Sequence, residues 1–267
     1  AMTASSPPLP EIRPVEPAAI RETERYLVEF PDRSFIGGPR SRWQEFKTLF
    51  AIMADFLRGF RKFHFAGPCV TIFGSARIRE GHQYYELTRQ TGAAVANLGF
   101  TVMTGGGPGL MEAANRGAKE AGGRSVGINI ILPFEQKPNP WLDAFVDMQF
   151  FFTRKTLLIK YSYAFIVMPG GLGTMDELFE ALTLIQTGKI KEFPVILMGT
   201  AYWKPVVDAL LKMRDEGMIS PADLNLLLVT DSVDEAMQCL RDKAITQFNL
   251  RHTKLPKSLR ILGEHEL

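Results

Sequence analysis

The chain has 267 residues, 46% of them hydrophobic and 22% charged, so it carries enough apolar side chains to bury a sizeable core. A formal net charge of +2 is too small to indicate nucleic acid as the main partner. No apolar run reaches the roughly 18 residues that span a membrane, and no basic stretch leads into an apolar one near the N-terminus. We therefore expect a cytoplasmic protein that binds neither nucleic acid nor a membrane.

The cysteines and histidines do not form a metal-binding pattern. Cys69 and Cys239 each have apolar neighbours, which predicts two buried thiols in a reducing compartment rather than a disulfide framework. The histidines are scattered along the sequence at His64, His82, His252 and His265. We therefore expect neither a metal nor a cofactor.

Helices are predicted before the main domain. Residues 1–15 are rich in proline and predict a loose segment. Residues 16–32 and 41–63 carry apolar side chains at helical spacing, and Gly37-Gly38-Pro39 separates them. We assign residues 1–65 to a flexible arm with helices that pack outside the main core or against another subunit.

From Cys69 onward, short apolar runs alternate with amphipathic stretches. The predicted strands are 69–73, 100–104, 125–132, 145–150, 164–168, 194–198 and 226–229. The predicted helices are 82–98, 109–121, 152–161, 174–187, 203–216 and 232–246. This alternation is typical of right-handed βαβ units and predicts an α/β fold, Rossmann-like and doubly wound, with a mostly parallel sheet covered by helices on both faces. We expect one domain over residues 66–246 and a solvated C-terminal tail over residues 247–267.

Glycines gather directly after three of the predicted strands. The segments are Gly74-Ser75-Ala76-Arg77, Gly105-Gly106-Gly107-Pro108-Gly109 and Pro169-Gly170-Gly171-Leu172-Gly173-Thr174. Ligands of parallel sheets bind outside the carboxyl ends of the strands, where glycine lets the backbone approach them closely. The second and third segments lead into helices, whose N-termini offer unpaired N–H groups and the positive end of a dipole. We therefore predict a phosphate site, to which Thr174 adds a hydroxyl.

Two familiar nucleotide-binding motifs are absent. The pattern G-x-G-x-x-G fails after both longer glycine segments, where Glu112 and Asp176 occupy the place of the last glycine. The P-loop pattern fails because Ile190 follows Gly188-Lys189. The glycine segments therefore predict neither a dinucleotide fingerprint nor a P-loop.

The glycine segments together resemble the LOG (Lonely Guy) family. The run from Pro169 to Glu177 matches the family hallmark P-G-G-x-G-T-x-x-E at every fixed position, and it follows the run from Gly105 to Glu112 in the family's order. Arg154-Lys155 precedes the hallmark at the family's distance, and Gly74-Ser75-Ala76-Arg77 looks like the family's first loop. The resemblance covers about residues 66–246.

The resemblance implies a phosphoribohydrolase that acts on cytokinin riboside 5′-monophosphates. Such an enzyme cleaves the bond between base and ribose in a nucleoside 5′-monophosphate and releases the free base and ribose 5-phosphate. Family members are often labelled possible lysine decarboxylases. A pyridoxal-phosphate enzyme needs a Schiff-base lysine, and nothing marks Lys155 or Lys160 for that role.

Cleavage of an N-glycosidic bond passes through a transition state that resembles an oxocarbenium ion, so the site needs a carboxylate near the anomeric carbon. The family's catalytic glutamate falls on Glu177, three residues after Thr174 in the helix that would hold the phosphate. Its catalytic arginine falls on Arg154, and a guanidinium can bind phosphate or hold the leaving base. We predict that Glu177 orients water or stabilises the ribosyl cation, with Arg154 as its catalytic partner.

Other residues of these segments are predicted to bind phosphate and ribose. Glu180 shares a helix face with Glu177, and Glu112 occupies the matching place after the second glycine segment. For Glu112, helix capping is the open alternative to a contact with a ribose hydroxyl. The predicted ligands are Gly106, Gly107, Gly109, Glu112, Gly170, Gly171, Gly173, Thr174, Glu180, Lys155, Ser75 and Arg77.

Three other functions stay open. A nucleosidase acting on AMP or another purine nucleotide would use the same phosphate and ribose ligands and differ only in the loops around the base. A non-catalytic carrier of a nucleotide or of molybdenum cofactor would keep the glycine segments without needing Arg154 and Glu177, so the presence of both favours the enzyme. A nucleotide sensor would also bind without turnover. The resemblance further implies a homodimer or a larger homo-oligomer.

Overall fold

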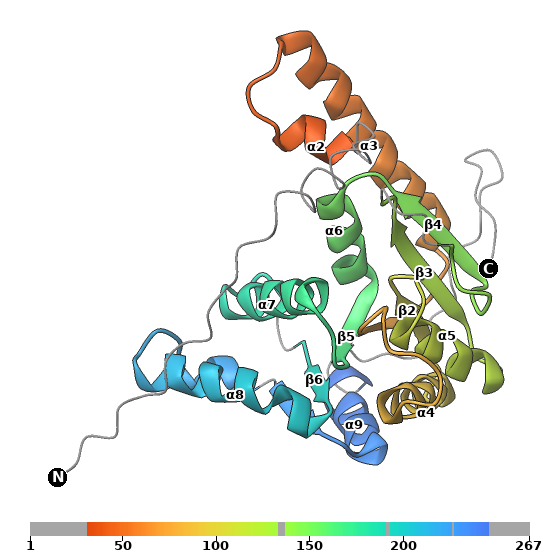
Figure 1. The fold of residues 1–267 in the computed structure, drawn as a ribbon, viewed down its shortest axis with the longest axis vertical. Coiled ribbons are helices and arrows are strands. Elements are labelled where there is room, and N and C mark those ends of the chain that lie inside the picture. Colours follow the sequence, from red (N-terminus) through yellow and green to blue (C-terminus); the bar gives the residue numbers. More distant parts are fainter. Residues whose placement is uncertain (1–30, 133–136, 191–192, 226, 246–267) are drawn as a thin grey trace, which may run out of the picture.

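The centre of the protein is a seven-stranded parallel sheet, seen in a computed structural model that describes residues 31–132, 137–190, 193–225 and 227–245 (Figure 1). The strands are β1 (Cys69–Phe73), β2 (Thr101–Thr104), β3 (Ser125–Ile130), β4 (Ala144–Met148), β5 (Ser162–Val167), β6 (Val195–Met198) and β7 (Leu227–Thr230). Their order is β4-β3-β2-β1-β5-β6-β7, and all these neighbours pair in parallel. The predicted Rossmann-like α/β fold is confirmed.

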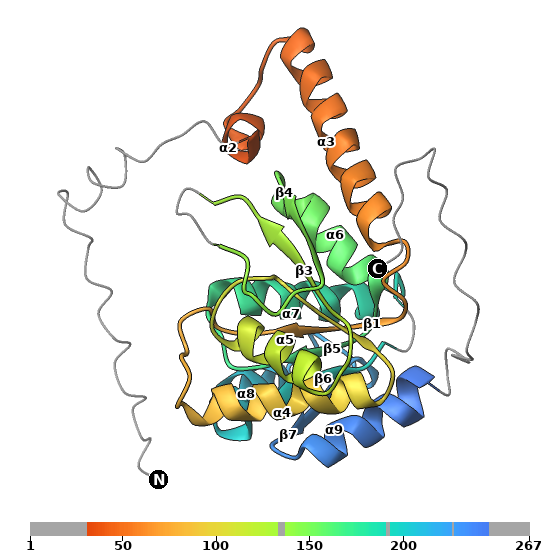
Figure 2. The ribbon, with the colours of Figure 1, turned by 90° about the vertical axis from the view of Figure 1, so that its right-hand side faces the viewer.

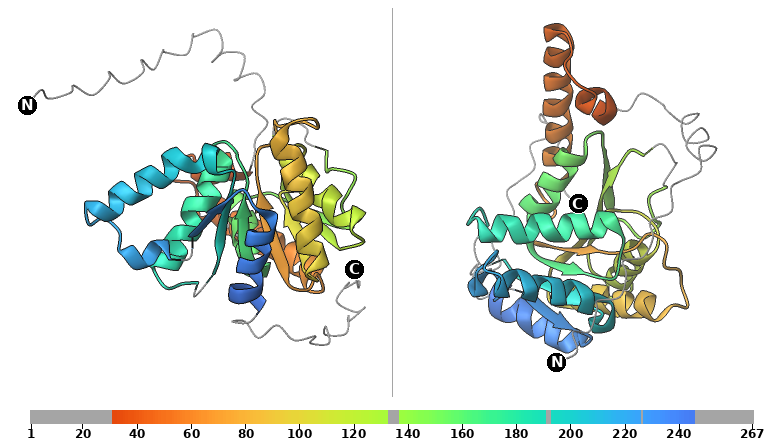
Figure 3. Two further views of the ribbon diagram at one scale, coloured as in Figure 1. Left: turned by 90° about the horizontal axis from the view of Figure 1, so that it is seen from below. Right: turned by 60° about the vertical axis from the view of Figure 1, so that its left-hand side comes forward.

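Helices form a layer on each face of the sheet (Figure 3). One layer holds α4 (Gln83–Asn97), α5 (Leu110–Glu120) and α9 (Val233–Cys239), and the other holds α6 (Phe151–Tyr161), α7 (Leu172–Gln186) and α8 (Thr200–Asp215). Side chains that alternate along the strands divide the apolar core in two. In β1, for example, Val70 and Ile72 face α4 and α5, whereas Cys69 and Phe73 belong to the core under α6 and α7.

The strand order creates a topological switch point between β1 and β5. From β1 the chain steps through β2 and β3 to β4 at one edge, and from β5 it steps through β6 to β7 at the other edge. Open α/β sheets bind their ligands beside such a point, at the carboxyl ends of the strands. The three glycine segments follow β1, β2 and β5, so the fold places all of them around the switch point.

From residue 31 onward two helices precede the sheet, and the longer one projects beyond it (Figures 1 and 2). They are α2 (Pro31–Ile36) and α3 (Arg42–Phe63), and α3 begins with a capping box between Ser41 and Gln44. The C-terminal half of α3 packs against β4 and α6, with Asp55, Gly59 and Phe63 buried. The predicted helix over 41–63 is confirmed, whereas residues 1–30 and 246–267 lie outside the described part of the chain.

One strand and one α-helix end earlier in the chain than the sequence predicts. The strand predicted over 145–150 is β4, which ends at Met148 because the N–H groups of Gln149 and Phe150 bond to the carboxylate of Asp55 instead of a neighbouring strand. The helix predicted over 232–246 is α-helical only to Cys239, and a π-helical turn (Leu240–Ile245) follows. No helix in the described ranges is long and apolar enough to cross a membrane.

Candidate active site

The three glycine segments meet at Ser75. Its backbone N–H donates to the carbonyl of Pro169 at 3.0 Å, and its own carbonyl accepts from the N–H of Leu110 at 2.9 Å. A Cβ at Gly109 would lie 2.5 Å from the carbonyl oxygen of Ser75, so a side chain there would force the two segments apart. The fold therefore brings the predicted segments together.

The segment after β2 is buried and tied to the protein by its own polar groups. The N–H of Gly106 donates to the hydroxyl of Thr104 at 2.9 Å, and the carbonyls of Gly106 and Gly107 accept from the side-chain amide of Asn139. The same amide reaches Asn115, which is also bonded to Thr104. These contacts fix the loop internally, and the N–H of Gly106 already has its partner within the protein.

The segment after β5 is open by contrast. Gly171 and Gly173 are exposed, and nothing lies within 4 Å of a Cβ built on either residue. Gly170 is buried because Thr174 packs over it. A Cβ at Gly170 would lie 2.1 Å from the hydroxyl oxygen of Thr174. The first turn of α7 therefore presents free backbone to solvent, as a phosphate site requires.

Arg154 reaches the site from the first turn of α6. Its Nε donates to the carbonyl of Ile128 at 2.9 Å, and its Nη2 would lie 2.4 Å from a Cβ at Gly105. Gly105 thus leaves the space that the guanidinium fills, and only 15% of the Arg154 side chain is exposed. Burial lowers the pKa of Arg154, which the charge of Glu177 partly offsets, and a guanidinium remains protonated throughout the physiological range.

Glu177 faces Arg154 from α7. Its Oε1 lies 4.0 Å from Nη1 of Arg154, and its side chain is 6% exposed. Within the described residues no hydrogen-bond donor reaches Oε2 of Glu177. Burial raises the pKa of Glu177 to about 7, although Arg154 and Lys155 act in the opposite direction. At neutral pH this carboxyl group is therefore divided between its two protonation states, as suits a general acid or base.

Lys155 links α6 to α7 on the same side of the sheet. Its Nζ lies 2.7 Å from Oε2 of Glu180 and 3.0 Å from Oδ1 of Asp176. Burial lowers the pKa of Lys155, but bonds to Glu180 and Asp176 outweigh it and the pKa is raised. In this structure Lys155 and Glu180 therefore pair with each other, and they hold the helices that carry Arg154 and Glu177.

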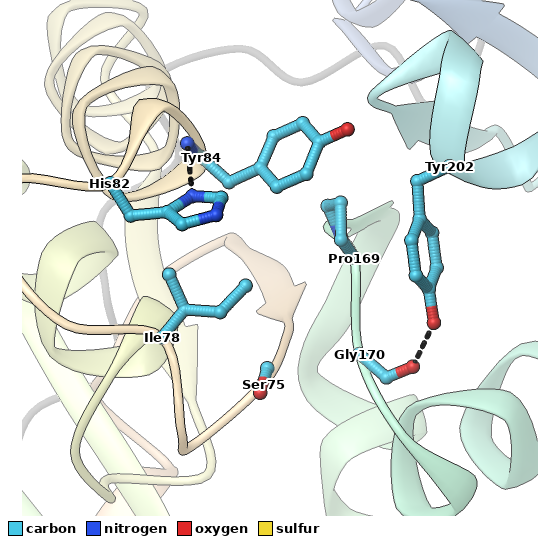
Figure 4. Close-up of a pocket in the computed structure, with 7 residues that line it drawn as sticks. All are labelled: Ser75, Ile78, His82, Tyr84, Pro169, Gly170 and Tyr202. Carbon is cyan, nitrogen blue, oxygen red and sulfur yellow. Dashed lines mark hydrogen bonds between the residues drawn. The ribbon is translucent and has the colours of Figure 1, made fainter.

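A shallow pocket of about 290 Å³ lies beside the switch point (Figure 4). Its lining residues are Ser75, Ile78, His82, Tyr84, Pro169, Gly170 and Tyr202. The hydroxyl of Tyr202 donates to the carbonyl of Gly170, which braces the segment after β5 (Figure 4). Neither Arg154 nor Glu177 is among the described residues that line this pocket, and none of those lining residues carries a carboxylate.

For two other predicted ligands, Arg77 and Glu112, the recorded interactions are with residues other than Arg154 and Glu177. Arg77 is exposed, and its backbone N–H donates to the hydroxyl of Ser75 at 3.1 Å. Glu112 acts electrostatically on Tyr85, on the α4–α5 side of the sheet. Among the described residues, no group of three or more histidine, cysteine or acidic side chains could hold a metal ion.

Three residues that support the site are not among those that the sequence analysis singles out. Asn139 holds the segment after β2, Tyr202 braces the segment after β5, and Asp55 bonds to the residues that open α6. Asp55 is the one with a visible mark in the sequence, because a lone carboxylate stands between the apolar residues of a helix. Asn139 and Tyr202 donate hydrogen bonds to backbone carbonyls, and no sequence pattern predicts such contacts.

Comparison with known proteins places these residues in a family. The family described as "Possible lysine decarboxylase" matches residues 111–240. A Mycobacterium tuberculosis protein named cytokinin riboside 5′-monophosphate phosphoribohydrolase is 33% identical over 155 residues, which cover 57% of this chain and 83% of the relative. A Rhodococcoides fascians protein of the same name is 30% identical, with 64% of this chain and 88% of the relative covered.

Solved structures share the fold. The X-ray structure of TM1055 has a TM-score of 0.52 and 26% sequence identity, and it covers 66% of this chain and 99% of its own. The molybdenum cofactor carrier protein of Chlamydomonas reinhardtii has a TM-score of 0.51 and 23% identity, with 67% of this chain and 99% of its own covered. At that identity the second likeness is one of fold alone.

Proposed function

The chain belongs to the LOG family, and we propose that it hydrolyses the N-glycosidic bond of a nucleoside 5′-monophosphate, releasing the free base and ribose 5-phosphate. The observation that carries the proposal is the environment of Glu177. A buried carboxyl group with a pKa of about 7 and a free oxygen stands beside a charged guanidinium, one helical turn behind an open N-terminus. The relatives named phosphoribohydrolases support the same reaction class.

The open turn of α7 supplies the phosphate site in this proposal. Gly171, Gly173 and Thr174 would offer backbone N–H groups and a hydroxyl to the 5′-phosphate, at the positive end of the helix dipole. Glu177 follows in the next turn, so it lies within a ribose's reach of the bound phosphate. Phosphate binding thus sets the distance between the anomeric carbon and the carboxylate.

The reaction then breaks the bond between C1′ of the ribose and the base nitrogen, and the bonding electron pair leaves with the base. The ionised carboxylate of Glu177 stabilises the positive charge that builds on the ribose and takes a proton from the water that attacks C1′. The departing base gains a proton from the solvent and leaves as the neutral species, and Glu177 returns the proton of the attacking water to the solvent, so that the net reaction consumes one water molecule. Arg154, 4.0 Å from Glu177, favours the charged form of the carboxylate and positions the substrate.

The substrate is a cytokinin riboside 5′-monophosphate in this proposal, as the names of the relatives suggest. The residues described above handle phosphate and ribose, so AMP is the natural competitor. The two substrates differ only in the group on N6 of adenine. Discrimination would therefore rest on the walls around the base and not on Glu177 or Arg154.

The test measures turnover of AMP and, separately, of isopentenyladenosine 5′-monophosphate, with free base and ribose 5-phosphate separated by chromatography. Glu177→Ala should lower the rate by at least about 100-fold, the usual scale for a lost general acid or base. Asp208→Ala is the matched control, because it removes a largely exposed carboxylate from α8. The faster substrate then defines the specificity.

Two outcomes would contradict the proposal. Equal rates in the wild type and in Glu177→Ala would remove the carboxylate from the mechanism. Binding of both nucleotides without release of base would instead favour a nucleotide or molybdenum cofactor carrier, or a sensor. Calorimetric titration with AMP separates binding from the absence of binding.

We further propose that the chain assembles as a homodimer or a larger homo-oligomer through α3. Seven large apolar side chains on this helix are exposed, and all of them except Leu49 form one stripe: Trp43, Phe46, Phe50, Met53, Leu57 and Phe60. Their spacing alternates between three and four residues, which is the pattern of a helix that packs along another helix. So many exposed large apolar side chains along one helix indicate an interface rather than a face in contact with solvent.

The assembly is tested by sedimentation or light scattering. The wild type should have the mass of at least two chains, and Phe50→Ser with Met53→Ser should reduce it, because both side chains belong to the exposed stripe. Met218→Ser, which removes an apolar side chain that is 73% exposed outside this stripe, is the control. A monomeric wild type, or an unchanged mass in the double variant, would exclude α3 as the interface.

A further inference from the structure

Asp55 of α3 is a buried carboxylate in a part of the chain that precedes the family match at residues 111–240. It is fully buried, and both of its oxygens lie 3.1 Å from the N–H of Gln149. Its Oδ2 also accepts from the N–H of Phe150 at 3.3 Å and from the hydroxyl of Thr153 at 2.5 Å. Nη2 of Arg58 lies 3.3 Å from Oδ1 of Asp55 and forms an ion pair with it.

These contacts cap the N-terminus of α6. The residue before the helix is Phe150, which has no side chain able to cap it. Asp55 takes over this role from α3, and Asp32 of α2 accepts from the N–H of Phe151 at 3.1 Å. Two carboxylates from the N-terminal helices thus accept from the N–H groups of Gln149, Phe150 and Phe151 at the start of α6, and they complement the positive end of its dipole.

The cap is connected directly to Arg154. The backbone N–H of Phe150 donates to Asp55, and the carbonyl of the same residue accepts from the N–H of Arg154 at 3.2 Å. Thr153, the residue before Arg154, places its hydroxyl between Asp55 and that same carbonyl. The backbone position of Arg154 is therefore set one hydrogen bond away from Asp55, while its guanidinium lies 4.0 Å from Glu177.

We propose that Asp55 is a positioning residue, which holds the first turn of α6 so that Arg154 lies beside Glu177. This inference rests on the proposed function, in which the pair carries the reaction. It makes α3 a part of the active-site scaffold, although the helix lies outside the family match. A shift of about 1 Å at a reacting centre is enough to cost orders of magnitude in rate, so a cap at this distance can control turnover.

The first test compares Asp55→Asn with Ser232→Ala. Asparagine keeps the size of the side chain and removes its charge, whereas Ser232→Ala removes the cap of α9, which lies on the opposite face of the sheet. We expect Asp55→Asn to lower kcat by about 10-fold at little change in KM, and Ser232→Ala to leave kcat unchanged. Thr153→Val removes one of the bonds to Asp55 without touching it, and Thr153→Ser should restore the rate.

Two further readouts separate positioning from loss of stability. In an Arg154→Ala background, Asp55→Asn should have no additional effect on kcat, because residues that act through one another are not additive. The acid limb of the rate profile should also move to higher pH in Asp55→Asn. Arg154 lowers the pKa of Glu177 together with Lys155, while Asp176 and Glu180 raise it, so withdrawal of Arg154 raises the pKa further.

Hydrogen exchange gives a readout that does not depend on turnover. Amides 149–154 should exchange faster in Asp55→Asn than in the wild type, and Ser232→Ala should leave them unchanged. If the wild type is active but Asp55→Asn matches Ser232→Ala in rate, or adds its full effect to Arg154→Ala, the inference fails and the proposed function stands. If the wild type cleaves neither nucleotide, the proposed function fails; unchanged exchange at 149–154 would then overturn the cap as well.

Discussion

Two glycine-rich segments that look alike in the sequence differ in what their glycines are for. After β2, the glycines are buried, and backbone or side chains of the protein occupy the space beside them: Arg154 at Gly105, and Ser75 at Gly109. After β5, Gly171 and Gly173 face open space. The first segment needs glycine so that the protein can pack against itself, and the second keeps space that a ligand can use.

The polar groups of the two regions differ in the same way. Around the segment after β2, Asn139 and Thr104 satisfy the backbone groups with several hydrogen bonds. Behind the segment after β5, Glu177 keeps a buried oxygen without a donor in the described residues. Unsatisfied buried polar groups cost stability and persist where function requires them. The comparison therefore separates a region whose backbone polar groups are bonded within the protein from one that leaves a buried carboxylate oxygen unbonded.

The largest expected effect comes from filling the packed segment. Gly109 has a φ of +74° and would place a Cβ 2.5 Å from the carbonyl oxygen of Ser75, so Gly109→Ala combines backbone strain with a backbone clash. We expect a loss of about 3 kcal/mol or more in the free energy of unfolding, measured by urea titration. Gly122→Ala is the matched control, since Gly122 has a φ of +75° and open space beside it.

The control decides what the packed segment depends on. Gly122→Ala carries strain alone and should lose about 1 kcal/mol. Equal losses in the two variants would mean that the contact with Ser75 has no cost. The proposed contrast between the glycine segments would then disappear.

An intermediate effect is expected from neutralising Glu177. Its pKa is raised from 4.5 to about 7, so the folded protein holds a proton that the unfolded chain releases as the pH rises through this interval. Stability contributed by the protonated group is therefore complete below about pH 4.5 and is lost as the pH approaches and passes 7. Glu177→Gln should be more stable than the wild type at pH 8 by about 2 kcal/mol, and by much less at pH 4.5.

Urea unfolding at both pH values measures this difference. Asp208→Asn, on a largely exposed carboxylate, should show no comparable dependence on pH. If Glu177→Gln has the same stability relative to the wild type at both pH values, the carboxylate is well solvated. The burial of Glu177 behind the segment after β5 would then not lower the stability of the protein.

The sequence predicts the sheet well because strands such as β1, β2 and β6 are buried on both faces and carry few polar side chains, as burial between two helical layers requires. It predicts less where tertiary contacts override local pattern. Residues 149 and 150 look like the end of a strand, but the carboxylate of Asp55, 94 residues earlier in the chain, takes their N–H groups. An interaction at that separation leaves no local signature.

The candidate site shows the same limit. Motif spacing brings Glu177, Arg154 and the glycine segments to one region, as the structure has them. Spacing does not reveal that Lys155 pairs with Glu180, or that the N–H of Gly106 is donated to Thr104. These partners depend on how α6, α7 and the loop after β2 pack in three dimensions. The sequence therefore predicts which residues come together more reliably than which partner each of them binds.

The smallest effect on stability, and the sharpest on function, is expected at the open segment. Gly173 lies in the first turn of α7 with nothing within 4 Å of a built Cβ, so Gly173→Ala should fold normally and gain up to about 1 kcal/mol from the better helix former. The same methyl group would stand where a phosphate approaches the helix N-terminus. We therefore expect KM for the nucleotide to rise by about 10-fold, which corresponds to about 1.4 kcal/mol of binding free energy.

This variant separates the two glycine segments more clearly than any other, because it changes binding while leaving the fold intact. Steady-state kinetics with AMP gives KM, and urea unfolding gives the stability of the same sample. Gly188→Ala, at a glycine with a φ of +69° beyond the other end of α7, controls for a substitution near this helix that is remote from the ligand. An unchanged KM in Gly173→Ala would show that the open space at the start of α7 is not where the phosphate binds, and the contrast with the segment after β2 would then have no functional meaning.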